Sequence, residues 1–197
     1  EKAGDRIVGV WENGYREITN NKRPIVKPED LAGIKLRVPG GVWRVKMFKA
    51  YGASPSPMEL KEVFVALQTG VMDGQENPLT QIYSQKFQEV QKYLSMTQHT
   101  YQAIYQVVNL DTWKKLTPDQ QKILREEGAS AGKLTRDLLQ GEEKGLIEML
   151  KGKGMQVSTP DLKPFKGAMG PADAEIAKYA GADNVAKFQK YVADAQK

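Results

Sequence analysis

The chain has 197 residues, of which 40% are hydrophobic and 27% are charged, a balance typical of a folded globular protein with a substantial core. It has no cysteine and a single histidine, His99, which excludes disulfides and zinc sites built from cysteines or several histidines and argues against a Ser-His-Asp triad. The net charge of +5 comes from mixed charges without a basic block, and no apolar run approaches the ~20 residues of a membrane-spanning helix.

The first elements follow from local patterns. Residues 7–11 form a short apolar run that predicts a buried strand, whereas the polar residues 12–22 predict a loop. Pro28 and the two acids after it predict the first turn of a short helix. Residues 34–38 alternate between apolar and basic side chains and predict a strand, and residues 42–51 predict a helix.

The next helix has the clearest start signal in the sequence. Ser56 is suited to the N-cap, Pro57 to the first helical position, and the glutamate three residues after the cap completes a capping box. An apolar stripe at helical spacing continues to Leu67. Residues 71–72 then predict a short strand, and residues 73–78 predict a turn rich in hydrogen-bonding groups.

The second half of the chain is dominated by two long elements. Residues 93–109 lack proline and glycine and are rich in Tyr, Thr and Val, which predicts one long strand or two short ones. Residues 118–151 predict the longest helix, and the four glycines inside it indicate close backbone contact or a bend. The other predicted elements are a strand at residues 155–158 and helices at residues 79–91, 171–179 and 184–196.

Strands that alternate with helices predict an α/β fold with a mostly parallel sheet, and the long helix suggests an element crossing between two lobes. Arg37 is the most informative residue because it lies one position before the end of a predicted strand. Ligands of open α/β sheets bind beyond the carboxyl ends of strands, where an arginine can hold a carboxylate by two hydrogen bonds. A solvated arginine on a strand face is the alternative.

Other candidates carry weaker signals. Asn77 can donate an amide hydrogen bond to an anion or cap the helix that follows it. Arg16 lies in a predicted glycine-containing loop and alone indicates nothing. Trp43 follows the loop after Arg37 and can pack either on a ligand or in the core. The candidate acids, such as Glu76, show no spacing of a carboxylate pair or of a metal site, and no phosphate-binding glycine motif occurs.

Short motifs along residues 11–100 carry a family resemblance. In order they are residues 13–16 (NGYR), 21–25 (NKRPI), 28–39 (PEDLAGIKLRVP), 52–58 (GASPSPM), 62–70 (EVFVALQTG), 73–78 (DGQENP) and 86–94 (KFQEVQKYL). Together they resemble the solute-binding subunits of tripartite ATP-independent periplasmic (TRAP) transporters, the DctP-type family. So many motifs in one order make the resemblance far more specific than any single short pattern.

The resemblance implies a two-lobe periplasmic-binding-protein-like fold with a long interlobe helix and an organic acid bound between the lobes. It implies that Arg37 clamps the ligand carboxylate, that Arg16 is a second arginine near the anion and that Asn77 donates to it. The protein would be periplasmic and would deliver the acid to the integral membrane subunits of a TRAP transporter. The candidates for choosing among acids are Trp43, Leu60 and Gln81.

The resemblance also implies that the N-terminal part of the first lobe is missing from this sequence. Residues 12–101 and 143–197 would form most of the second lobe. Residues 1–11 and 102–142 would be a remnant of the first lobe together with the crossing long helix. An exposed strip of apolar side chains would then remain where the first lobe is incomplete.

We expect no catalytic residue, no metal site, no cofactor and no nucleic-acid partner. The alternative function is an α/β enzyme acting on a carboxylic acid, which would need Glu76 or Asp73 as a general base in the same cleft. A nucleic-acid binder is suggested only by the basic net charge, and the mixed charge pattern speaks against it.

Overall fold

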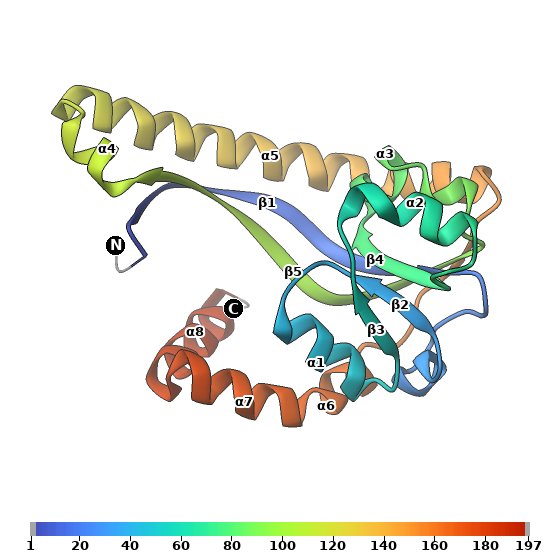
Figure 1. Cartoon of the computed structure of the whole chain (residues 1–197). Helices are drawn as coiled ribbons and strands as arrows, with labels where there is room; N and C mark the ends of the chain where they lie inside the picture. Colours follow the sequence, from blue (N-terminus) through green and yellow to red (C-terminus); the bar gives the residue numbers. More distant parts are fainter. Residues whose placement is uncertain (1–2, 196–197) are drawn as a thin grey trace.

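A six-stranded mixed sheet organises the computed structural model, which describes residues 3–195 (Figure 1). The strands lie in the order β3-β2-β4-β1-β5-β6. They are β1 (Asp5–Asn20), β2 (Lys35–Val38), β3 (Ser54–Pro57), β4 (Gly74–Pro78), β5 (Tyr93–Asn109) and β6 (Gln156–Ser158). The helices are η1 (Pro28–Leu31), α1 (Val42–Ala50), α2 (Leu60–Gln68), α3 (Leu79–Ser84), η2 (Phe87–Glu89), α4 (Leu110–Lys115), α5 (Pro118–Gly152), α6 (Lys163–Ala168), α7 (Gly170–Ala180) and α8 (Ala182–Ala195).

The sheet is parallel at its edges and antiparallel at its centre. β2 runs parallel to β3 and β4, and β6 runs parallel to β5, whereas β1 is antiparallel to both β4 and β5. The expected α/β class is confirmed. The prediction of a mostly parallel sheet is wrong at the centre, where β1 and β5 are antiparallel to each other. These two long strands pair directly from Asp5 opposite Asn109 to Asn20 opposite Tyr93, and they form a ribbon that extends beyond the lobe (Figure 1).

Two segments predicted as a loop and a turn are strands. Residues 12–20 belong to β1, and residues 74–78 form β4 between β2 and β1, while residues 71–72 form no strand. Polar residues are unusual in central strands, which explains the wrong prediction. Here their side chains are hydrogen-bonded to one another, as in the pair Gln75 Nε2 to Thr19 Oγ1 at 2.9 Å, so burial leaves them satisfied.

The predicted helix start at Ser56 is also wrong. Ser54–Pro57 is the edge strand β3, where prolines are tolerated because one side of the strand needs no ladder hydrogen bond, and α2 begins at Leu60 after Glu59 as N-cap. The predicted helix at residues 79–91 divides into α3 and η2, because Lys86 adopts a left-handed φ of 57° between them.

Several predictions are confirmed, and two helices were not expected. The structure contains β2, α1, β5 as one long strand, α5 and β6 close to their predicted bounds, and it places α7 and α8 at the predicted C-terminal helices. Residue 196, the predicted end of the last helix, lies outside the described residues. Helices α4 and α6 were missed because each is short; Asn109 caps α4 by accepting hydrogen bonds from the amides of Asp111 and Thr112.

The lobe has a hydrophobic cluster on each face of the sheet. Leu36 and Val38 of β2 point to the cluster that packs against Phe48 of α1 and Phe165 of α6. Helices α2, α3 and α5 cover the opposite face. Because side chains alternate along a strand, the side chain of Arg37 points to the opposite face of the sheet from Leu36 and Val38. Arg37 lies near the carboxyl end of β2.

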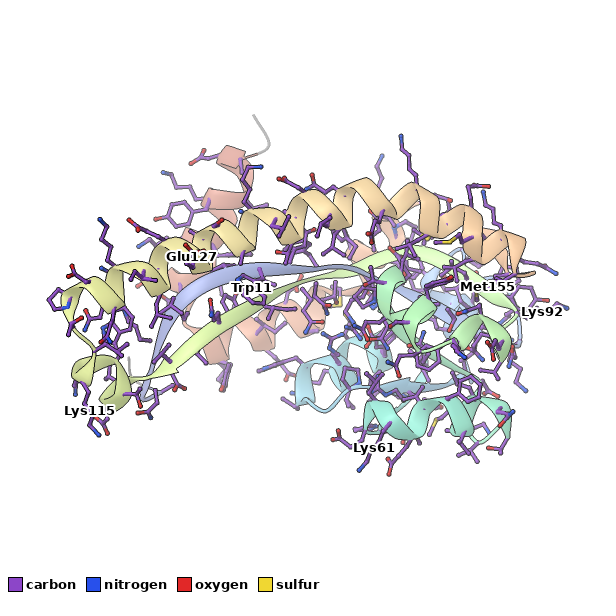
Figure 2. All side chains as sticks on the ribbon, turned by 90° about the horizontal axis from the view of Figure 1, so that it is seen from above. Trp11, Lys61, Lys92, Lys115, Glu127 and Met155 are labelled. Atoms are coloured by element: carbon purple, nitrogen blue, oxygen red, sulfur yellow. The ribbon has the colours of Figure 1, made fainter. Side chains whose placement is uncertain are left out.

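The helix α5 lies along β1 at backbone contact distance (Figures 1 and 2). A Cβ atom added to Gly128 would lie 2.5 Å from the carbonyl oxygen of Val8, and one added to Gly132 would lie 2.4 Å from that of Val10. Trp11, which Figure 2 shows beside the helix, donates its indole hydrogen bond to the Gly128 oxygen at 3.2 Å. Among residues 3–195, no helix combines the length and hydropathy required of a membrane span.

These contacts predict opposite effects for two glycine substitutions in α5. Gly132→Ala is expected to destabilise the protein by about 1–3 kcal/mol, because the new methyl group forces the helix away from β1. Gly141 has no heavy atom within 4 Å of an added Cβ, so Gly141→Ala is expected to stabilise by about 0.5–1 kcal/mol through helix propensity. Urea denaturation of both variants measures the difference, and equal stabilities would contradict the close packing.

Candidate functional site

A fully buried carboxylate, Glu76 of β4, lies at the centre of a cluster of cationic side chains. Arg16 of β1 donates from Nε to Glu76 Oε2 at 2.5 Å and from Nη2 to Oε1 at 3.0 Å. Arg44 of α1 donates from Nη1 to both carboxylate oxygens at 3.0 Å. The strand and the helix therefore converge on one anionic group that is shielded from water.

His99 of β5 completes the surroundings of Glu76. Its Nε2 lies 3.1 Å from Glu76 Oε2, and its Nδ1 lies 2.7 Å from Thr97 Oγ1. Because a carboxylate only accepts, the network assigns the proton to Nε2 and leaves Nδ1 to accept from Thr97. Burial lowers the pKa of His99, with Glu76 opposing that effect, so the imidazole is neutral at pH 7.

Glu76 stays ionised. Burial acts to raise its pKa, but the hydrogen bonds from His99 and Arg16 outweigh burial and lower the pKa to about 2. A carboxylate held in this way is unsuited to accept a proton as a general base near neutral pH. The other candidate base, Asp73, accepts from the backbone amide of Lys35 at 2.9 Å and pairs with Lys22 at 3.3 Å, so it lies at the opposite end of β4.

The structure brings Arg16 and Asn77 into direct contact. Arg16 Nη2 donates to Asn77 Oδ1 at 3.0 Å, and Arg16 Nη1 donates to Gln102 Oε1 at 2.7 Å. Asn77 Nδ2 in turn donates to Gln75 at 2.6 Å. The Arg16 guanidinium is therefore held in place on all sides, and one further hydrogen on the Asn77 amide is left for another acceptor.

Arg37 differs from Arg16 because most of its donors are unused. The residue is 3% exposed, and its Nε donates to the Met58 carbonyl oxygen at 2.8 Å. Within residues 3–195, no group accepts a hydrogen bond from its Nη1 or Nη2. Burial lowers the pKa of Arg37, and Glu76 partly offsets this effect. A buried guanidinium that presents two free parallel donors is complementary to a carboxylate.

The cluster has an excess of positive charge. Arg16, Arg37 and Arg44 are cationic, Glu76 is anionic and His99 is neutral, which gives a net charge of +2. Charges of like sign in a buried place are costly without a counter-charge. The arrangement therefore favours a bound anion at the carboxyl ends of β2 and β4. No group of three acidic or histidine side chains within residues 3–195 is placed to hold a metal ion.

The three further candidates from the sequence are less closely connected to the arginines. Trp43 packs against Tyr179 of α7 with 5.3 Å between ring centroids, and Lys46 lies over its ring. Leu60 packs against the cluster under α2, and Gln81 is half-buried on α3. Within residues 3–195, no hydrogen bond, ion pair or ring contact joins these three side chains to Arg16 or Arg37.

Arg44 and Gln102 were missed by sequence reasoning, and His99 was considered only as a structural or exposed residue. Arg44 lies in the first turn of the predicted helix that directly follows Arg37 and the Pro39–Gly41 break, which is the signal that was available. Gln102 and His99 come from β5, far from Arg16 in sequence, and only the pairing of β5 with β1 brings them to Arg16.

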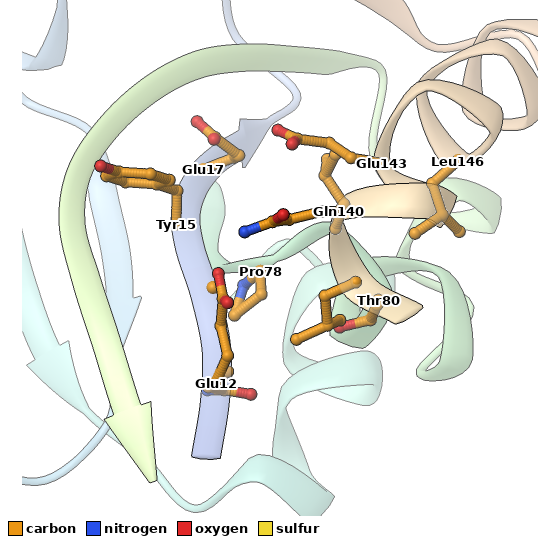
Figure 3. A pocket seen from close by; sticks show the side chains of 12 residues that line it. Glu12, Tyr15, Glu17, Pro78, Thr80, Gln140, Glu143 and Leu146 are labelled. Atoms are coloured by element: carbon orange, nitrogen blue, oxygen red, sulfur yellow. The ribbon is translucent and has the colours of Figure 1, made fainter. Parts of the chain in front are cut away.

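A separate hollow lies between β1, α3 and α5 (Figure 3). Its lining includes Glu12, Tyr15, Glu17, Gln140 and Glu143. Glu17 is 1% exposed and accepts a hydrogen bond from the amide of Gln98 at 2.9 Å. Burial raises the pKa of Glu17 to about 7; the backbone hydrogen bonds act against this and the charge of Glu143 adds to it.

This environment predicts a pH-dependent stability. Because the folded protein holds the Glu17 proton up to about pH 7 while the ordinary pKa is 4.5, the free energy of unfolding should fall as the pH rises from 4.5 to 7. Glu17→Gln is expected to remove this fall and to stabilise the protein above pH 7 by up to about 3 kcal/mol. Denaturation at pH values from 4 to 8 measures the free energy of unfolding. If this free energy falls as steeply with pH in Glu17→Gln as in the wild type, the raised pKa does not belong to Glu17.

Comparison with known sequences identifies proteins that are similar to this chain. The family model described as bacterial extracellular solute-binding protein, family 7 (DctP), matches residues 1–179. The sialic acid-binding periplasmic protein SiaP of Vibrio cholerae is 39% identical over 188 residues, which are 95% of this chain and 58% of SiaP. The 2,3-diketo-L-gulonate-binding periplasmic protein YiaO of Escherichia coli is 37% identical over 171 residues, 86% of this chain and 52% of YiaO.

Solved structures give the same result for the fold. A TRAP periplasmic solute-binding protein from Polaromonas sp. JS666 bound to D-erythronate has a TM-score of 0.90 and 38% identity, with 95% of this chain and 62% of that chain covered. One from Ralstonia eutropha H16 with bound (S)-2-acetolactate has a TM-score of 0.91 and 30% identity, with 98% and 64% covered. The chain thus spans about half to two thirds of the length of these proteins.

Proposed function

Because the chain belongs to the DctP family of bacterial extracellular solute-binding proteins, we propose that it captures an organic acid by its carboxylate. In this proposal the acid is carried in a periplasm and delivered to the integral membrane subunits of a TRAP transporter, and the chain catalyses no reaction. Family members are binding proteins of transport systems, and of the two candidate bases Glu76 is held ionised among its cationic partners while Asp73 lies at the opposite end of β4.

The observation that carries the proposal is the state of Arg37. Its guanidinium is buried and is repelled by the charges of Arg16 and Arg44, and its two Nη groups have no acceptor within residues 3–195. A carboxylate at this place would receive two charge-assisted hydrogen bonds and would offset part of the net charge of the cluster. Such bonds are stronger than neutral ones, and their geometry selects a planar anion over a hydroxyl group.

We assign the remaining sequence candidates to supporting roles. Arg16 contributes positive charge from a fixed position, and the free amide hydrogen of Asn77 donates to the same anion. Trp43, Leu60 and Gln81 are proposed to border the rest of the ligand and to influence which acid is preferred. Named ligands of relatives, such as L-galactonate in a Roseobacter denitrificans protein and β-D-galacturonate in a Sulfitobacter protein, are all organic acids.

We propose that the chain contributes one nearly whole lobe to a two-lobe protein. Residues 12–101 and 143–197 would form the second lobe, and residues 1–11 and 102–142 would belong to the first lobe and the crossing helix. The ribbon carries exposed apolar side chains at its end away from the lobe, among them Ile7, Val10, Tyr105 and Val107. An apolar face of this kind is suited to packing against further protein.

The proposal is tested by titrating the chain calorimetrically with organic acids and with the methyl esters of the same acids. The ester keeps the rest of the molecule and replaces the charged carboxylate by a neutral group that is larger by one methyl. We expect binding of at least one acid and loss of binding for its ester. Equal binding of acid and ester would overturn the assignment of a carboxylate to the arginine cluster.

A further inference from the structure

The strand β5 has a bulge where the six-stranded sheet narrows to the two-stranded ribbon. β4 pairs with β1 no further than Arg16, and β6 pairs with β5 no further than Ser95. Between the pairs Arg16–Thr100 and Ile18–Ser95, β1 has one residue and β5 has the four residues 96–99. Such a bulge bends the strand and interrupts its hydrogen-bond ladder, so other contacts must fix its conformation.

Glu17 is the residue of β1 opposite the bulge, and its side chain holds the most strained position. Gln98 has a left-handed φ of 43°, a conformation that is costly for a residue with a side chain. Its amide donates to Glu17 Oε2 at 2.9 Å. The next residue, His99, places its Nε2 3.1 Å from Oε2 of Glu76. The Glu17 side chain therefore helps to position the imidazole that contacts the centre of the arginine cluster.

Two further acids share the surroundings of Glu17. Figure 3 shows Glu143 of α5 and Glu12 of β1 around the hollow that Glu17 borders. Glu143 also lines a second hollow, on the side of Gln98. Burial and the charge of Glu143 together raise the pKa of Glu17 against the hydrogen bonds from the bulge. Ionisation of Glu17 therefore places a buried charge beside charges of the same sign.

Cations near the hollow do not balance this charge. Arg136 of α5 acts on Glu12, and Lys144 lines only the second hollow. α3 and β4 contribute uncharged side chains to the lining, and Tyr15 of β1 contributes a phenol. Within residues 3–195, Glu17 forms no ion pair. Tyr15 is 47% exposed, so the hollow leads to solvent, and an ionised carboxylate can reach water by leaving the bulge.

We propose that Glu17 is a positioning residue that couples the binding of a proton to the binding of the anion. The protonated side chain holds the bulge in the conformation in which His99 contacts Glu76. The ionised side chain moves toward water, which releases the strained Gln98, and its negative charge also repels the anion. The inference rests on the proposed function and adds a dependence on pH to it.

The sign of this dependence follows from the two states of the chain. With an anion bound, the bulge is fixed and Glu17 keeps its proton up to about pH 7. Without the anion, the carboxylate can leave the bulge, and its pKa then approaches the ordinary value of 4.5. The bound state therefore holds more protons between these values. The affinity should fall as the pH rises to about 7 and should level off above it.

The test is a calorimetric titration of the chain with D-erythronate, L-galactonate and β-D-glucuronate, acids that solved relatives hold. For the acid that binds most tightly, we expect the Kd to rise about 3-fold to 30-fold from pH 5 to pH 8. Titrations at pH 6.5 in MES and in imidazole, which differ in enthalpy of ionisation, measure the protons exchanged. We expect uptake of up to about one proton per bound anion.

Two variants separate a proton-linked role from a merely structural one. Glu17→Gln keeps the shape of the protonated side chain and cannot ionise, so the Kd should be independent of pH and no proton should be taken up. Glu143→Gln removes a charge that raises the pKa of Glu17, so the fall in affinity should end at a lower pH. Glu142→Gln is the matched control, because Glu142 is exposed on the same helix, and it should keep the wild-type profile.

The outcomes distinguish this inference from the proposed function. If the wild type binds an acid equally tightly at pH 5 and pH 8, the inference is wrong and the proposed function stands. A dependence on pH that persists unchanged in Glu17→Gln would also overturn the inference, because another group would then take up the proton. If the wild type binds none of the three acids at any pH, the proposed function fails and the inference fails with it.

Discussion

Replacing Arg37 by alanine is expected to abolish measurable binding of an organic acid. The substitution removes both free Nη donors and one of the positive charges, and truncating one partner of a buried charge pair costs about 2–5 kcal/mol. This corresponds to a loss of affinity of roughly 30-fold to several thousand-fold. Calorimetric titration of wild type and Arg37→Ala with the same acid measures the effect.

Two further variants show whether the loss of affinity depends on the guanidinium group of Arg37. Lys35→Ala removes a positive charge from an exposed position of the same strand and should leave the affinity nearly unchanged. Arg37→Lys keeps the charge but not the two parallel donors, so an affinity between those of wild type and Arg37→Ala is expected. An Arg37→Ala variant that is folded and binds with wild-type affinity would refute the role of Arg37.

Replacing Glu76 by alanine is expected to have the largest effect on stability. Glu76 is fully buried and contacts Arg16, Arg44 and His99, so its removal leaves the buried Arg16 and the partly buried Arg44 without their counter-ion. Breaking a buried ion pair from one side typically costs about 3–5 kcal/mol. Urea denaturation at pH 7 measures the loss, and a cost below about 1 kcal/mol would contradict the central place of Glu76.

Acid denaturation tests the same carboxylate without relying on a variant that folds poorly. Because the folded-state pKa of Glu76 is about 2 and its ordinary value is 4.5, its contribution to stability is present above pH 4.5 and is lost as the pH falls toward 2. Glu76→Gln should lack this part of the acid dependence. Glu127→Ala, at an exposed position of α5, is the control and should follow the wild-type profile.

Burial and charge at the site act on both binding and stability. Arg16 and Arg44 are held by Glu76, so in the proposed function their guanidinium groups are fixed in place before a ligand binds. The cost of this arrangement is a repulsion among arginines that only a counter-charge relieves. Relief of this repulsion would lower the Kd of an anionic ligand, and the folded chain would then be stabilised by the amount that this Kd and the ligand concentration set.

The sequence predicted the long elements better than the site. Residues 93–109 and 118–151 could be identified because strand-forming residues and helical periodicity persist over many positions. The segments around Arg16 and Asn77 were wrongly predicted as a loop and a turn, since their polar residues resemble exposed segments. If the proposed function holds, those residues are polar because they form the binding site, and the functional requirement overrides the usual pattern of a buried strand.

The remaining site residues depend on contacts that local patterns do not contain. Arg37 could be identified from its place at the end of a predicted strand, whereas His99 reaches Glu76 only because β5 pairs with β1 across a long ribbon. Arg44 could be identified as a partner of Glu76 only with knowledge of the direction of α1 relative to β4. Trp43 was a candidate either for contact with a ligand or for packing in the core, and its contact with Tyr179 of α7 could not be foreseen from a single sequence.

The measurement that tests the central claim most directly is a crystal structure of the chain with an acid that it binds. The account predicts that a ligand carboxylate lies about 2.7–2.9 Å from Nη1 and Nη2 of Arg37, with Glu76 still between Arg16 and Arg44. A ligand bound elsewhere, or one that places a neutral group against Arg37, would contradict the account.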